Sequence, residues 1–356
     1  MIDFLESIIP YISGLYTLPW ILVGFILTIV IAKLLGREKI DKLMKKIGLM
    51  LLYFFVPVLI FRIFLNTPFG IDEVIFAGVT TVIIIVMYII AFLYAKSSAA
   101  KQKLTDEKYR LYLKTVLTNQ GRSSAFIGSM MLAIPEWRVY AAIFMALVGI
   151  GLFAVIPAIL SIMHKKETKS DKQSKNPLPW FLKLYPWYLI AFVLAGVLVQ
   201  LATGLKSSEL LGAEADVILR LYTAITIPAA LYYVGAGIHP KDLKIPELKK
   251  LVGIDKTGDD NQHWQWVRNI FVMTVAITPI ILVAAFASLY LAGLISSAWF
   301  AVITINAFLP ITSTNMFLLP YGIDKKSTAH AVTWTTLVCV PIVVALLTVF
   351  DLMFNL

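Results

Sequence analysis

The sequence predicts an all-α protein that crosses a membrane many times, and three observations support this fold class. The chain has 356 residues, of which 59% are hydrophobic and only 15% are charged, against roughly 25% charged in soluble domains. Its mean hydropathy is +0.83. Uncharged runs such as 139–163 are long enough to cross a hydrocarbon core of about 30 Å as a helix. This composition argues against a soluble globular fold.

Ten apolar segments, each close to the length of a membrane-spanning helix, follow one another along the chain. The first five lie at 15–36, 45–66, 74–95, 111–134 and 139–162, and the second five at 184–204, 217–238, 268–294, 297–320 and 327–352. We expect two five-helix units, 1–162 and 184–356, joined by a cytoplasmic linker at 163–183. The polar stretches 163–178 and 239–264 are predicted to be flexible solvated loops.

The basic residues fall in alternate loops, which sets the expected orientation of the spans. All but five of the 31 Lys and Arg residues lie in loops on one side, the exceptions being Arg62, Arg122, Arg138, Lys206 and Arg220. Lys and Arg accumulate in cytoplasmic loops. Both termini of this integral membrane protein are therefore predicted to lie on the outer side of the cell membrane. The same bias explains the net charge of +10, so no nucleic-acid partner is expected.

The N-terminus bears on the first span. Residues 1–16 include Asp3 and Glu6 but no Lys or Arg, so they lack the positive region of a cleavable signal peptide. The first helix is therefore expected to remain in the lipid bilayer.

An internal repeat relates the two halves. The first span reads PWILVGFILTIVIAKLLG from Pro19, and the sixth reads PWYLIAFVLAGVLVQLATG from Pro186. The second and seventh spans match more weakly, as FFVPVLIF and ITIPAALYY. Since five is an odd number, the halves must be inverted relative to each other. Inverted repeats of this kind place a substrate site near the midplane, where broken helices meet.

The fourth and ninth spans are predicted to be the broken, crossing helices. The fourth carries TNQGRSS at its centre, and the ninth carries Pro310 followed by a polar stretch. Gly and Pro both weaken the helical ladder and free backbone groups that need other partners. Polar residues of these types also serve as ordinary contacts between membrane helices. We interpret the two clusters as a substrate site formed by Asn119, Gly121, Arg122, Ser123, Asn306, Pro310, Thr312, Ser313 and Asn315.

Several segments together resemble the auxin efflux carrier family. The ninth span and its sequel, NAFLPITSTNMFLLPYGIDKKSTAHAVTWTTLVCVPIVV, resemble the C-terminal signature of that family. TNQGRSSAFIG, TIPAALYYVGAGI and WVRNIFVMTVAITPIIL resemble its fourth, seventh and eighth spans. Two positions depart from the pattern: Phe126 stands where the family usually has Pro, and Arg122 stands where it has an apolar residue. Bile-acid:sodium symporter-like proteins of similar fold are the main alternative.

The resemblance implies a carrier for a small organic anion, such as a mono- or dicarboxylate. It implies that spans 1, 2, 6 and 7 form a scaffold that assembles as a homodimer. Spans 3–5 and 8–10 would form a transport domain that moves by an elevator mechanism. A sodium-coupled carrier is the first alternative function, and a channel is a less favoured one.

Arg122 and the lack of buried acids bear on the mechanism. An Arg at a helix centre costs roughly 2.5 to 3.5 kcal/mol on insertion scales, so Arg122 needs a partner. That partner is either an anionic substrate or the carbonyls of the ninth span, and the sequence leaves both open. Arg62 and Arg220 are interpreted as interfacial anchors, and His330 as a polar end of the last helix. No acid or His falls at the midplane, so uncoupled transport of an anion is the simpler account.

Other classes of function lack their motifs. Ser123 and Ser124 have no general base in view, and HExxH and a phosphate-binding loop are absent, so we expect no enzyme. Cys339 is the only cysteine, which excludes a disulfide or a thiolate cluster within one chain. No cofactor and no metal site are expected.

The orientation can be tested in the linker. A cysteine introduced by Ser170→Cys, in a Cys339→Ser background, should react with an impermeant thiol reagent only from the cytoplasmic side. Labelling of that cysteine in intact cells from outside would contradict the orientation.

Overall fold

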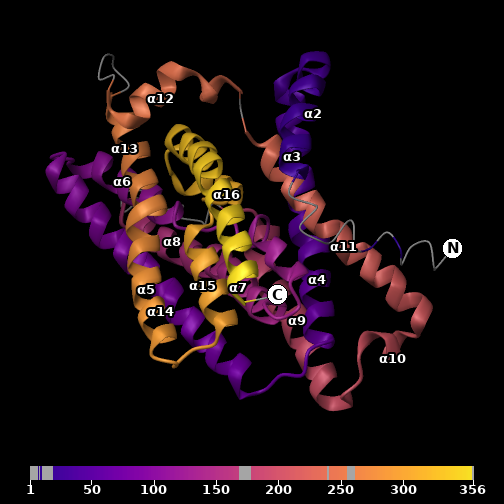
Figure 1. Cartoon of the computed structure of the whole chain (residues 1–356). Coiled ribbons are helices and arrows are strands. Elements are labelled where there is room, and N and C mark those ends of the chain that lie inside the picture. Colours follow the sequence, from indigo (N-terminus) through magenta and orange to yellow (C-terminus); the bar gives the residue numbers. More distant parts are fainter. Residues whose placement is uncertain are drawn as a thin grey trace.

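The computed structural model describes Ser7, Ile9 and residues 19–167, 178–238, 240–254 and 261–354, without the side chains of 164–167 and 261. Every regular element in these ranges is a helix, and the helices form one bundle (Figure 1). Some sequence predictions lie outside the described part. They concern Asp3, Glu6, Lys169, Ser170, Lys172, Lys175 and Lys256, and the side chains of Lys165 and Lys166.

In the described residues of the first half, nine α-, 3-10- and π-helical elements precede the α8 helix. They are α2 (Trp20–Leu35), α3 (Arg37–Met50), η2 (Leu51–Phe55), α4 (Val56–Leu65), α5 (Ile71–Lys101), α6 (Asp106–Thr118), η3 (Gly128–Ala133) and α7 (Arg138–Ile150), followed by η4 (Gly151–Val155) and α8 (Ile156–Glu167). The elements of each run α3–η2–α4 and α7–η4–α8 follow one another without a gap, so each run is a single long helix.

The second half begins with α9 (Trp180–Thr203), α10 (Ser207–Leu211) and α11 (Ala213–Ala236). It continues with η5 (Pro240–Leu243), α12 (Ile245–Val252), α13 (Asn261–Val272), η6 (Met273–Ile277), α14 (Thr278–Leu291), α15 (Ser297–Phe308), η7 (Ser313–Tyr321) and α16 (Lys325–Phe354). The run α13–η6–α14 is again one continuous helix.

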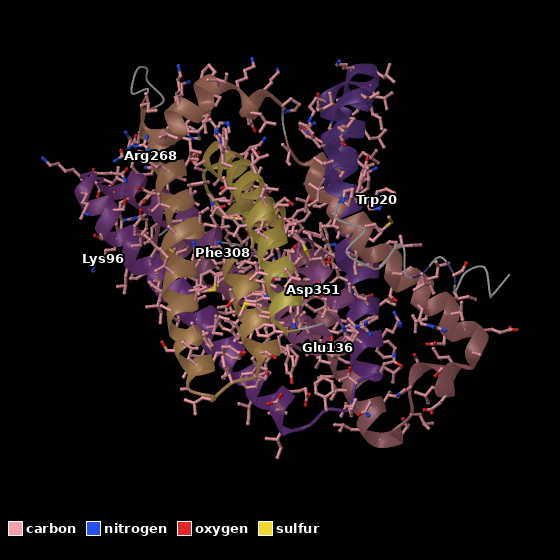
Figure 2. All side chains as sticks on the ribbon, in the orientation of Figure 1. Trp20, Lys96, Glu136, Arg268, Phe308 and Asp351 are labelled. Atoms are coloured by element: carbon pink, nitrogen blue, oxygen red, sulfur yellow. The ribbon has the colours of Figure 1, made fainter. Side chains whose placement is uncertain are left out.

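Seven helices in the described part are long and apolar enough to cross a membrane, and two shorter apolar helices, α2 and α15, accompany them. The chain is therefore an all-α polytopic membrane protein. These nine helices, together with the broken segment α6–η3, coincide with the ten apolar segments of the sequence. The division into inverted five-helix repeats stays a prediction. Figure 2 shows Arg268 toward the end of the bundle that carries α12 and Glu136 toward the opposite end.

The prediction that 239–264 is only a flexible loop is wrong, because this stretch contains α12 and the start of α13. Pro246 lies in the first turn of α12 and Gly253, at φ +84°, ends it with backbone bonds to Lys249 and Lys250. Arg268 of α13 donates to the carbonyls of Lys250 and Leu251 at 2.9 Å. These contacts stabilise a short helix that the polar composition concealed.

Prolines inside three long helices follow π-helical turns. Pro57, Pro157 and Pro279 each come two residues after the end of η2, η4 and η6 respectively. A proline cannot donate to the carbonyl four residues before it, and its ring crowds that carbonyl. The wider turn relieves this crowding, so the helices continue through the membrane.

Glycines allow the four helices of the predicted scaffold to approach closely. A Cβ atom on Gly24 of α2 would overlap the backbone carbonyl of Tyr232 in α11, and one on Gly235 of α11 would overlap the carbonyl of Ile21. In the second pair, a Cβ atom on Gly196 of α9 would lie 2.8 Å from the carbonyl oxygen of Phe61 in α4. Small residues let helix backbones pack this tightly in membranes, so α2–α11 and α4–α9 form close pairs.

Gly24→Ala should destabilise the fold by about 1 to 3 kcal/mol, because the added methyl forces α2 away from α11. The measurement is a thermal melt of the purified protein. Gly78→Ala is the matched control, since a Cβ atom at Gly78 of α5 meets no atom within 4 Å. Equal melting temperatures for the two variants would contradict the close packing.

Candidate functional site

The two broken segments meet and pair with each other. The α6 helix ends at Thr118, and α15 ends at Phe308. In the segments that follow these two helix ends, Arg122 and Ile311 form an isolated antiparallel bridge. The amide of Ser123 donates to the carbonyl of Pro310, and the amide of Thr312 donates to the carbonyl of Gly121, both at 2.9 Å. Each break therefore supplies the backbone partners that the other lost.

Gly121 is required for this close approach. A Cβ atom there would lie 2.6 Å from Oδ1 of Asn315 and 3.4 Å from Cγ2 of Thr312. Pro310 has no N–H group, so the chain at this point presents only a carbonyl to its neighbour. The local sequence thus explains both why the helices stop and how the two extended segments fit together. We call residues 119–124 and 309–315 the crossover.

The nine candidate residues lie at or beside the crossover. Gly121, Arg122, Ser123, Pro310, Thr312 and Asn315 belong to its two paired segments and are buried. Asn306 lies one turn away on α15 and accepts from Ser124 at 2.9 Å. Asn119 is turned toward α16, where its amide donates to the hydroxyl of Thr328 at 3.1 Å. Ser313 is half-buried and lines a different small space from the one that Arg122 lines.

Arg122 is buried, at 2% exposure, and is only partly paired. Its Nη1 donates to the carbonyl of Leu309 at 3.3 Å, which ties the fourth span to the ninth. In the described part of the chain, its Nε and Nη2 have no hydrogen-bond partner. The same holds for both amide atoms of Asn315 and for the amide oxygen of Asn119. A buried polar atom left without a partner costs about 1 to 3 kcal/mol. The crossover therefore presents donors and acceptors suited to a polar ligand.

The spaces that adjoin the crossover within the described part of the chain are small. One of about 20 Å³ is lined by Arg122, Thr312 and Tyr185, among others. Another, of about 10 Å³, is lined by Ser123, Ser313 and Val234, among others. These volumes admit at most about one water molecule. Since α9 supplies part of the first lining and α11 part of the second, a larger ligand can enter only if these helices and the crossover separate.

A second polar cluster joins α13 to α16, and the sequence analysis recognised only part of it. Nε2 of His263 and Nδ1 of His330 lie 2.8 Å apart, and Nδ1 of His263 lies 2.9 Å from the hydroxyl of Ser327. Asp324 and Asp242 lie beyond the two rings, at 3.8 Å from His263 and 3.4 Å from His330. His263 was hidden in a stretch taken for a loop. The available signal was that His263 lies in the first turn of a long apolar helix, much as His330 lies in the second turn of another.

Asp324 caps α16 and is held in its ionised form. Its carboxylate accepts from the amide of Ser327 at 2.7 Å. Burial raises the pKa of Asp324, but hydrogen bonds from His263 and Ser327 outweigh burial and lower the pKa from 3.8 to about 2. Because the folded pKa lies below the unfolded one, the charge stabilises the fold above about pH 4, and this contribution is lost as the pH falls toward 2.

Asp324→Asn should lower the stability by less than about 1 kcal/mol near neutral pH, since Asn still caps a helix but lacks the charge. The difference from the wild-type chain should stay constant down to about pH 4 and shrink below it. Thermal melts across this pH range measure it. A difference that shrinks already between about pH 7 and 5 would contradict the role given to the Asp324 charge.

Comparison with protein-family models finds no match for this chain, and no curated protein matches it.

Proposed function

We propose that this protein is a secondary transporter that carries a small organic anion across the membrane. The observation that carries the proposal is the state of Arg122: a buried guanidinium at the crossing of two broken helices, with two nitrogen atoms unpartnered in the described part of the chain. None of the ion pairs of the described residues involves this side chain. A carboxylate would satisfy both free nitrogens through charge-assisted hydrogen bonds.

The proposed movement separates two groups of helices. The close pairs α2–α11 and α4–α9 would form the scaffold, and the remaining long helices with the crossover would form the transport domain. The small spaces beside Arg122 and Ser123 are lined by both groups, so they mark the boundary. Sliding along this boundary would expose the crossover to one side and then the other, as in an elevator mechanism. Membership of the auxin efflux carrier family is part of this proposal.

The homodimer is also part of the proposal and rests on the resemblance to that family. The scaffold would supply the contact between the two copies. The α9 helix presents large apolar side chains outward, namely Trp187, Leu198 and Leu201. Such a face suits either lipid or a second copy of the chain.

Sodium-coupled transport is the second candidate, and one observation favours it. Three buried amide oxygens near the crossover, on Asn119, Gln120 and Asn315, have no donor in the described part of the chain. Neutral oxygen atoms of this kind are ligands for hard cations. Replacing sodium with choline during a substrate-binding measurement distinguishes the two candidates, because only the coupled carrier loses affinity.

Arg122→Gln should weaken carboxylate binding by roughly 10- to 150-fold, because it removes a charge-assisted contact worth about 1.5 to 3 kcal/mol. The protein should still reach wild-type levels, since an uncharged side chain inserts more easily. Binding is measured by thermal stabilisation with a panel of mono- and dicarboxylates, and transport by counterflow in liposomes.

Arg110→Gln is the control, because it makes the same change on an exposed residue of α6. Arg122→Lys, which retains the charge, should keep more affinity than Arg122→Gln. Wild-type affinity in Arg122→Gln would assign Arg122 to structure and contradict the proposed site.

A further inference from the structure

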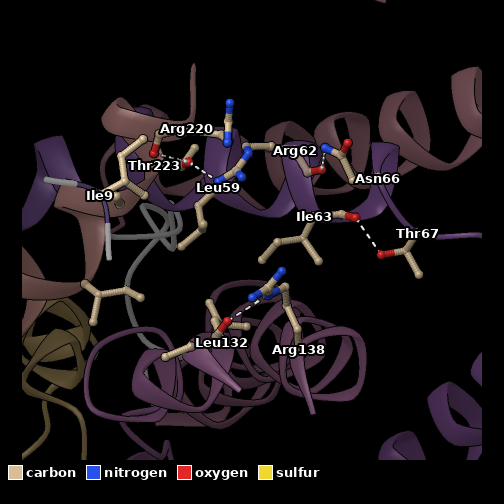
Figure 3. A pocket seen from close by; sticks show the side chains of 13 residues that line it. Ile9, Leu59, Arg62, Ile63, Asn66, Thr67, Leu132, Arg138, Arg220 and Thr223 are labelled. Carbon is tan, nitrogen blue, oxygen red and sulfur yellow. Dashed lines mark hydrogen bonds between the residues drawn. The ribbon is translucent and has the colours of Figure 1, made fainter. Parts of the chain in front are cut away.

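A second cavity lies at the opposite end of the bundle from α12, away from the crossover, and three arginines line it (Figure 3). Its volume is about 460 Å³. Arg62 comes from the end of α4, Arg220 from α11 and Arg138 from the start of α7. The interpretation of Arg62 and Arg220 as interfacial anchors is therefore incomplete, because both half-buried side chains border one partly open cavity with a third arginine, the exposed Arg138.

Two of the arginines are held in place by neutral partners. Nη1 of Arg62 donates to the hydroxyl of Thr223 at 2.7 Å, which links α4 to α11. Nε of Arg138 donates to the carbonyl of Leu132 at 2.8 Å, which links α7 to η3. Figure 3 shows Arg62 on the wall with Thr223 and Arg138 on the opposite wall. Each contact orients a guanidinium without neutralising it.

The acidic groups near the cavity do not balance these charges. Asp216 is buried and pairs with Arg220, with its Oδ2 3.0 Å from Nε of Arg220, and it also accepts from the hydroxyl of Ser207. Glu136 attracts Arg138 from an exposed position but forms none of the ion pairs of the described residues. Asp216 also attracts Arg62, more strongly than either Arg138 or Arg220 alone repels it. Nε of Arg62 is buried and has no partner in the described part of the chain.

An anion is the ligand that fits these observations. Like charges held together in a partly buried space are unfavourable unless a counter-charge joins them. The guanidinium group has a planar fork that pairs with a carboxylate through two parallel hydrogen bonds. Arg62 and Arg138 project from opposite walls, so a molecule with two carboxylates can engage both. A volume of this size falls within the range of small-molecule sites.

We propose that this cavity binds a soluble dicarboxylate at the outer entrance of the transporter, and hence that the substrate carries at least two carboxylates. The inference rests on the proposed function. Arg62 and Arg220 belong to the proposed scaffold, whereas Arg138 belongs to the proposed transport domain. A dicarboxylate in the cavity therefore bridges the two parts before it reaches Arg122.

The test measures equilibrium binding of succinate and acetate to the purified full chain in discs of neutral phosphatidylcholine. Arg62→Gln and Arg138→Gln should each weaken succinate binding about tenfold or more and leave acetate binding nearly unchanged. Lys206→Gln is the matched control, since it removes a positive charge from the same end of the bundle without lining the cavity. Wild-type affinity for succinate in both arginine variants would overturn the proposal.

Two further arms separate this proposal from its alternatives. The first arm uses an Arg122→Gln background. If this variant still binds succinate and adding Arg138→Gln abolishes that binding, the ligand lies in the arginine-lined cavity, even if no carboxylate is transported. If Arg122→Gln abolishes transport while Arg62→Gln and Arg138→Gln bind succinate as the wild-type chain does, only the crossover site is supported and the cavity proposal is overturned. A lipid headgroup offers the same chemistry through its phosphate. Arg138-dependent retention of phosphatidylglycerol, with no succinate binding, would overturn the assignment to a soluble dicarboxylate.

Discussion

Backbone amides and carbonyls inside a membrane protein have no water to bond with, so a helix that stops within the membrane must find other partners for them. In this chain the partners are exchanged between two breaks: Ser123 with Pro310, and Thr312 with Gly121. The exchange requires that both helices break at the same depth and that one contact residue lack a Cβ atom. Much of the surrounding architecture follows from holding these two short segments against each other.

One consequence is that side chains beside the crossover are buried without all of their polar atoms being paired. The backbone exchange fixes the position of Arg122, while among the described residues its side chain donates to one carbonyl, that of Leu309. The interior is dense here, and the adjoining spaces hold no more than about a water molecule. Unpaired polar groups in a dense interior are unfavourable, so a conformation that admits a complementary ligand gains stability from binding it.

The sequence predicted the features that depend on local pattern. Apolar runs located the seven long helices and the two shorter apolar ones. The TNQGRSS stretch and Pro310 located both breaks, because loss of helical hydrogen bonding is a property of a few adjacent residues. The sequence pattern did not predict α12. Part of the stability of this helix comes from Arg268, a residue of α13 that donates to the last carbonyls of α12. The pattern also could not bring Arg62, Arg138 and Arg220 together, since they are far apart in the chain and meet only through tertiary packing.

The placement of positive charge follows from the same packing. The glycine contacts of α2 with α11 and of α4 with α9 leave no room for a ligand inside either helix pair. The arginine-lined cavity of Figure 3 and the crossover both lie at the boundary where these pairs face the other helices. Arg122 is at the boundary near the centre of the fold, and Arg62 and Arg138 are at the boundary near one end. Because a charge is least costly where a ligand or water can reach it, the boundary along which we propose relative motion is also a place where arginines are tolerated.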